Sequence, residues 1–96
     1  MRRFVSAPIR PDGDELATPA AGGEPPLPAA FDWQGRTLRV ASIVRTWRST
    51  KDDRGDVYLK RHWFEILTPE GARAQLYFDR GARRGAARWW LYTIDE

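Results

Sequence analysis

With 96 residues, 42% of them hydrophobic and including five Trp, three Tyr and four Phe, the chain is expected to fold as one globular domain rather than stay disordered. The absence of cysteine excludes disulfides, thiolate metal sites and cysteine nucleophiles, and it indicates a cytoplasmic protein. The net charge is +3 and fourteen of the sixteen cationic residues are Arg, which binds phosphate and stacks on aromatic rings, although a GC-rich coding sequence would produce the same bias.

The first thirty residues are predicted to form a short strand and a linker. Arg3 to Ile9 has the pattern of a strand, and Pro8 favours an edge position because proline cannot donate to a ladder. Residues 10–30 hold five of the seven prolines and three of the eight glycines, which predicts a linker or a long surface loop. The apolar stretch at the start is too short for a signal peptide or a membrane span. We therefore divide the chain into 1–30, strand and linker, and 31–96, a small β domain.

The β domain is predicted to begin with a hairpin over residues 31–40, FDWQGRTLRV. Gln34-Gly35 forms its turn, because glycine adopts the positive φ that a two-residue hairpin turn requires. Farther along, the apolar residues change phase by one position, which predicts a β-bulge in a long, bent strand. These residues are Val40, Ile43, Val44 and Trp47. The polar residues 49–58 predict the next loop.

A second hairpin and a final strand complete the predicted sheet. Residues 61–68 and 73–79 alternate between apolar and polar, and Pro69-Glu70-Gly71 between them predicts a tight turn. After a loop over residues 80–86, the last strand is expected from Arg88 to Ile94. Five or six short antiparallel strands without helical periodicity predict an all-β fold, either a small curled sheet or an SH3-like barrel, because closure removes exposed edges.

Alternation along the strands assigns side chains to two faces. Polar neighbours place Trp63 outside, and Arg88 favours an outward Trp90 and Tyr92 on a last strand that is aromatic on both faces. The residues predicted to face inward are His62, Phe64, Ile66, Ala74, Leu76, Phe78, Trp89 and Leu91.

The outer face gathers aromatic and cationic side chains, which we take as a candidate binding site. Its members on the strands are Arg61, Trp63, Arg73, Tyr77, Arg88, Trp90 and Tyr92. Arg83 and Arg84 lie in the loop over residues 80–86, before the last strand. This loop has the composition of a phosphate-binding loop and equally that of a plain mobile hairpin loop. An aromatic patch of this size needs a cover. Either the N-terminal third folds over it, or it receives unstacked bases or a peptide.

No catalytic site, metal site or cofactor is predicted. His62 is the single histidine, so a two-histidine metal site is excluded, and we expect it to be structural. The carboxylates Asp52, Asp53 and Asp56 lack the spacing of a calcium loop and predict a solvated turn. The tripeptide Arg54-Gly55-Asp56 matches an adhesion motif that is frequent by chance.

Four blocks of the sequence resemble a known family. The blocks FVSAPI, FDWQGRTLRVASIVRTWR, RHWFEILTPEGARAQLYFDR and RWWLYTIDE are similar to a small uncharacterised bacterial domain that occurs as a stand-alone protein. The last two blocks also resemble the C-terminal tail of the inactive Y-family DNA polymerase relative of the bacterial mutasome. The resemblance implies a β fold without an assigned activity, and a link to DNA repair.

Two hypotheses of function follow. The first is a non-enzymatic module, without membrane association, whose Arg and aromatic face contacts nucleic acid, single-stranded above all, or DNA-processing proteins. The alternative is a protein-interaction or self-assembly domain without nucleic-acid contact. Salt separates them, because counterion release makes nucleic-acid binding strongly dependent on ionic strength.

Overall fold

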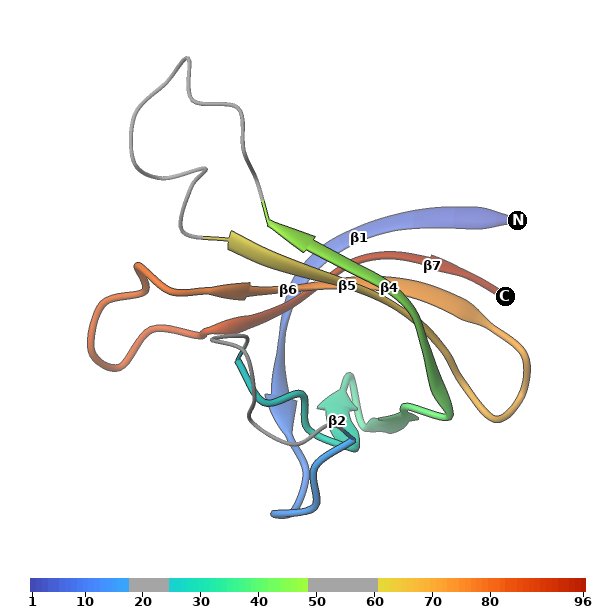
Figure 1. The fold of residues 1–96 in the computed structure, drawn as a ribbon, viewed down its shortest axis with the longest axis horizontal. Coiled ribbons are helices and arrows are strands. Elements are labelled where there is room, and N and C mark those ends of the chain that lie inside the picture. The colour runs from blue at the N-terminus through green and yellow to red at the C-terminus, as the bar shows by residue number, and fades with distance from the viewer. Residues whose placement is uncertain (18–24, 49–60) are drawn as a thin grey trace.

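The computed structural model describes residues 1–17, 25–48 and 61–96, and these form a single curled sheet with the shape of a half-barrel (Figure 1). All neighbouring strands are antiparallel, in the order β3-β2-β1-β7-β6-β5-β4. The strands are β1 (Arg2–Pro11), β2 (Ala30–Trp33), β3 (Arg36–Arg39), β4 (Ser42–Arg48), β5 (Arg61–Leu67), β6 (Arg73–Asp79) and β7 (Trp89–Asp95). The predicted all-β fold is confirmed, with seven strands in place of five or six.

Strand β1 connects the two parts of the sheet. It pairs with β7 from Arg2 to Ile9 and with β2 at Arg10 and Pro11, and a bulge after Phe4 bends it. The edge position predicted for this strand is therefore wrong. Pro8 is tolerated in a central strand because the ladder with β2 starts only at Arg10, so the missing N–H interrupts no pair on that side.

Both predicted hairpin turns are present. Gln34 and Gly35 have φ angles of 51° and 75°, which is the pair of positive values that a type I′ turn requires. Gly71 has a φ of 90°, and the Thr68 hydroxyl accepts a hydrogen bond of 3.0 Å from the Ala72 amide across the second turn. Local turn chemistry thus sets the register of β2 with β3 and of β5 with β6.

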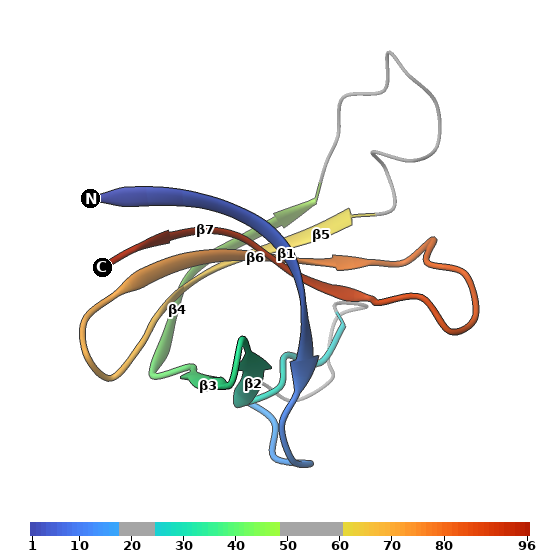
Figure 2. The same cartoon turned by 180° about the vertical axis from the view of Figure 1, so that it is seen from behind.

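The predicted bent strand is two strands that meet at a corner. Strand β3 ends at Arg39 and β4 begins at Ser42. At the corner the Val40 amide donates to Ala29 and the Ala41 amide donates to Leu67, so the chain passes from one end of the sheet to the other. The predicted bulge lies between Ile43 and Arg45. The corner places β2 and β3 beneath the curved β4–β7 sheet (Figures 1 and 2).

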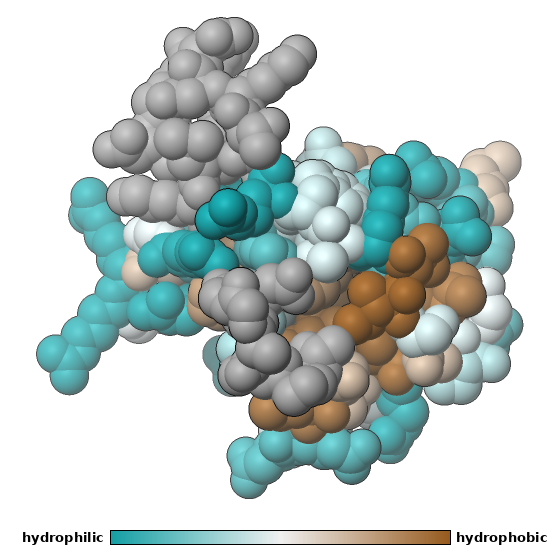
Figure 3. All heavy atoms as spheres, in the orientation of Figure 1, coloured by the Kyte–Doolittle hydropathy of each residue, from teal (hydrophilic) through white to brown (hydrophobic). Residues whose placement is uncertain are grey.

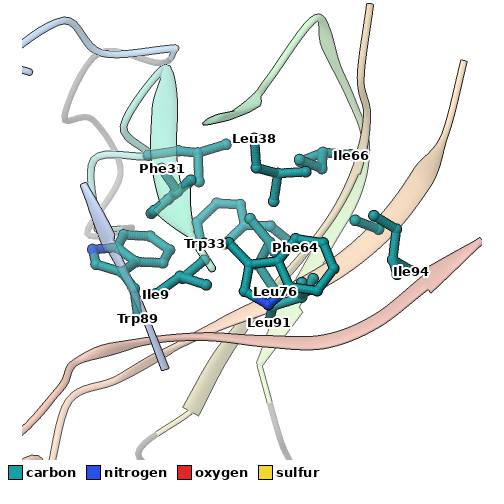
Figure 4. Close-up of a cluster of buried hydrophobic side chains, with 12 residues drawn as sticks. Ile9, Phe31, Trp33, Leu38, Phe64, Ile66, Leu76, Trp89, Leu91 and Ile94 are labelled. Carbon is teal, nitrogen blue, oxygen red and sulfur yellow. The ribbon is translucent and has the colours of Figure 1, made fainter. Parts of the chain in front are cut away.

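The hydrophobic core fills the concave side of the curl. In Figure 4, Phe31 and Leu38 of the β2–β3 hairpin point toward Phe64, Ile66 and the other inner side chains of the β5–β7 strands. The Trp89 ring packs at 5.3 Å from Phe31, 5.7 Å from Phe64 and 5.0 Å from Phe78. The residues predicted to face inward are confirmed as buried, apart from Phe78, which is half-buried against the core.

Part of the predicted linker belongs to this core. Leu27 is fully buried, and backbone hydrogen bonds of 2.7 and 2.9 Å join Ala17 to Leu27 and Ala29 to Glu15.

On the face shown in Figure 3, hydrophobic residues gather beside β4, where Val44 remains 42% exposed. The predicted loop over 49–58, with its three aspartates and the adhesion-like tripeptide, lies outside the described residues, as do residues 18–24.

Candidate functional site

One row of side chains crosses the strands on the outer, convex face of the sheet. Trp47 pairs with Trp63, and Trp63 pairs with Tyr77. Tyr77 pairs with Trp90, and Trp90 pairs with Pro8. Directly paired residues of antiparallel strands present their side chains to the same face. We call these five residues, from β4, β5, β6, β7 and β1, the aromatic row.

The rings of the aromatic row contact one another. Trp47 and Trp63 are stacked with centroids 5.9 Å apart and planes within 2°, and Tyr77 and Trp90 are stacked at 6.0 Å and 4°. Trp63 and Tyr77 connect the two stacks at 4.9 Å. Such pairs contribute about 0.5–1.5 kcal/mol each beyond the area they bury. The row is therefore held in place by its own ring contacts.

Tyr92 and Phe4 extend the row toward the chain termini. Tyr92 meets Trp63 edge-on at 5.1 Å, and Phe4 meets Tyr92 edge-on at 5.1 Å. The register between β6 and β7 shifts at Tyr92, and this irregularity leaves both Tyr92 and Thr93 on the outer face. Six rings therefore form one connected array.

The array is accessible to solvent over most of its length. Tyr77 is the buried ring at its centre, 5% exposed, whereas the three tryptophans and Tyr92 are half-buried and Phe4 is 66% exposed. A half-buried ring retains surface on which a planar group can stack. Tyr77 is thus the buried centre of the array, and its neighbours keep exposed ring surface.

Two arginines lie over rings of the row. The guanidinium carbon of Arg45 is 4.7 Å from the Trp47 ring, and that of Arg61 is 4.5 Å from the Tyr77 ring, both within the range of cation–π attraction. Burial raises the pKa of the Tyr77 hydroxyl, the positive charge of Arg61 opposes this, and Asp79 adds to it. Tyr77 therefore stays neutral at physiological pH.

A row of hydrogen-bonded polar groups runs beside the aromatic row. The Glu65 carboxylate accepts a 2.9 Å bond from Arg45 and lies 3.4 Å from Arg73, and Thr93 donates to Gln75 at 3.3 Å. Burial alone would raise the pKa of Glu65, but hydrogen bonds from Arg45 and Gln75 and the charges of the two arginines hold it below its ordinary value. The buried carboxylate thereby fixes Arg45 where it covers Trp47.

Most of the predicted site residues meet on this face. Arg61, Trp63, Arg73, Tyr77, Trp90 and Tyr92 all lie there. Arg88 precedes β7, and Arg83 and Arg84 lie exposed in the β6–β7 loop, which extends beyond the sheet in Figures 1 and 2. The part of all nine residues in binding stays a prediction.

Trp47, Arg45 and Phe4 lie on this face but were not predicted from the sequence. The bulge between Ile43 and Arg45 moves Trp47 by one position, so simple alternation does not assign it to a face. When the bulge is counted as one extra residue in β4, the register with β5 places Trp47 opposite Trp63. Phe4 gave no such signal, because its neighbour Tyr92 lies 88 residues along the chain.

The described part of the N-terminal third does not cover the aromatic row. Leu27 and Phe31 pack in the concave core, on the opposite side of the sheet. On the outer face, β1 contributes Phe4 and Pro8 at the border of the array. The interpretation in which this third folds over the rings is therefore not supported by residues 1–17 and 25–30.

His62 occupies a structural position. It is buried, its Nε2 lies 2.7 Å from the Thr46 hydroxyl, and its ring packs 5.0 Å from Phe64. Among the residues that the structure describes, no three His, Asp or Glu side chains are grouped to hold a metal ion. No helix long and apolar enough to cross a membrane occurs in residues 1–17, 25–48 or 61–96.

Comparison with protein families gives one match, which spans residues 1–96. The chain belongs to DUF6504, a domain of unknown function. Neither a curated protein nor a solved structure matches it. The DUF6504 family carries no assigned function.

Proposed function

We propose that this protein is a cytoplasmic, non-enzymatic module that binds single-stranded nucleic acid across the outer face of its sheet. The aromatic row carries the proposal: the half-buried rings of Trp47, Trp63 and Trp90 lie in one row with Tyr77, and the guanidinium groups of two arginines lie over Trp47 and Tyr77. Unpaired bases stack on such rings without regard to sequence, and each stack contributes about 1–3 kcal/mol.

The charge of the surroundings supports a polyanionic partner. Arg45 and Arg61 lie over the row, and the loop after β6 carries Arg80, Arg83, Arg84 and Arg88 against Asp79 at its start. Arginine suits this role because its planar fork contacts phosphate oxygens and also stacks on bases. In the proposal, the rings take the bases and the arginines take the backbone.

The resemblance of residues 61–80 and 88–96 to a polymerase-relative tail supports a setting in DNA repair. In that setting, single-stranded DNA and the proteins that process it are the natural partners. DNA-processing proteins would then meet the same module, either on this face or on another one.

A protein partner is the second candidate function, and Phe4 is the observation that favours it. Its ring is 66% exposed at the border of the array, where an apolar contact would bury it. Tyr, Trp and Arg are also the residues enriched at the energetic centres of protein interfaces. A second copy of this chain or a different protein would use the same surface.

Fluorescence titration tests the proposal. The five tryptophans include three of the aromatic row, so oligo(dT) and oligo(U) are expected to quench their emission, with affinity that falls steeply between low and high salt. Absence of binding at low salt would contradict the proposal. Sedimentation of the protein alone then tests self-assembly, which a monomer at high concentration would exclude.

A further inference from the structure

A groove opens where β1 leaves β7. The last register pair between these strands joins Ile9 to Trp89, after which β1 turns to pair with β2. The groove between them is lined by residues 8–11 and 85–89 and encloses about 540 Å³. Its floor includes the buried side chains of Ile9 and Trp89.

Two arginines lie on opposite sides of this groove. One step beyond the Ile9–Trp89 pair, the register would place Arg10 opposite Arg88, and both residues line the groove and are exposed. Neither forms an ion pair within the part of the chain that the structure describes, and this includes Asp32, the β2 partner of Arg10. Like charges that face each other repel, and an anion between them relieves the repulsion.

The groove continues the aromatic row. Pro8 is the last member of the row and also lines the groove. Arg83 and Arg84 immediately precede the lining residue Gly85, whose φ of 85° turns the chain back toward β7. A ligand that crosses the rings from β4 to β7 therefore reaches Arg88 and Arg10 next.

We propose that this groove binds the phosphodiester backbone of the strand whose bases stack on the aromatic row. The inference rests on the proposed function and adds a path to it: the strand runs across the β-strands, passes Trp90 and Pro8, and ends between Arg10 and Arg88. The aromatic row is sufficient for a short oligonucleotide, and only a longer one reaches the groove.

The path is tested by comparing the affinity for oligo(dT) of about four nucleotides with that for oligo(dT) of about twelve. These lengths lie within the range that one small β-barrel covers. We expect the double variant R10Q/R88Q to bind the long oligonucleotide more weakly, with a salt slope lower by about 0.7 for each arginine, and to bind the short one as the unchanged protein does. Arg39→Gln on β3 is the matched control and should retain both affinities. The charge-preserving R10K/R88K should retain the salt slope.

Three results would overturn the path. In the first, R10Q/R88Q binds the long oligonucleotide as tightly as the unchanged protein does. In the second, R10Q/R88Q loses affinity equally for both lengths. In the third, inorganic phosphate alone shifts the amide resonances of residues 85–88, while oligonucleotide length has no effect on affinity. The last result identifies a site for free anions. If the unchanged protein binds neither length at low salt, the proposed function itself fails and the path fails with it.

Discussion

The two faces of the same strands differ in how deeply they bury their aromatic rings. On the concave face, Trp89 and Phe64 are buried among both aliphatic and aromatic side chains from the two parts of the sheet. On the convex face, Trp90 and Trp63 contact other rings, and both remain half-buried. The concave face thus stabilises the fold, whereas the convex face leaves ring surface exposed, which is the surface that the proposed function uses. Substitutions on the two faces should separate folding from binding.

The largest effect is expected for Trp89→Ala. The Trp89 ring contacts Phe31, Phe64 and Phe78, so its removal leaves a cavity at the centre of the core. Loss of a buried tryptophan costs about 3–5 kcal/mol of the free energy of unfolding. Urea denaturation measures this loss, and a change below about 1 kcal/mol would contradict the inward placement of Trp89.

The second effect concerns Glu65 of β5, whose carboxylate forms ion pairs with Arg45 of β4 and Arg73 of β6. Glu65→Gln removes the charge that Arg45 and Arg73 share, and a hydrogen bond to a charged group contributes about 1.5–3 kcal/mol. Glu65→Gln should therefore lower the midpoint of thermal unfolding. Leu67→Gln, a substitution on the same strand that leaves the ion pairs intact, serves as the control for a general effect on β5.

The same group predicts a pH dependence with a defined sign. The folded pKa of Glu65 is lowered below its ordinary 4.5, so its stabilising contribution is present above that value and is lost as the pH falls through the folded pKa. The difference in stability between the unchanged protein and Glu65→Gln should thus shrink below about pH 4.5. A difference that stays constant down to the lowest pH at which both proteins fold would contradict this account.

Trp90→Ala is the outer counterpart of Trp89→Ala, on the adjacent position of the same strand. It loses one stacked ring pair, which predicts a loss of about 1 kcal/mol in stability. Binding of oligo(dT) should fall by about tenfold, since one base loses its stacking partner. If Trp90→Ala unfolds the protein as Trp89→Ala does, the distinction between the faces is wrong.

The smallest effect is expected at a turn that touches neither face. Gly35→Ala meets no atom within 4 Å of the added carbon, so its cost comes from the φ of 75° alone. We expect a loss of about 1 kcal/mol in stability with unchanged binding. Gly81→Ala, at a glycine without a positive φ, is the control and should lose less.

How far the sequence could predict this structure differs between elements. The hairpins over 31–40 and 61–79 followed from turn residues and alternation, because both signals lie within a few residues of each other. The outward positions of Trp63, Tyr77 and Trp90 followed in the same way. Trp47 was missed because a bulge interrupts the alternation, and Phe4 because its partner strand is distant in sequence.

The sequence by itself determined an all-β fold, two hairpins and two unlike faces, since a period of two and positive-φ turns are local properties. Only the tertiary structure decided that β1 lies in the centre of the sheet, that Leu27 is in the core, and that four rings from four strands align with Pro8 in one row. Those features depend on the register between distant strands and on the corner after β3. Both are set by how the whole sheet buries its concave face.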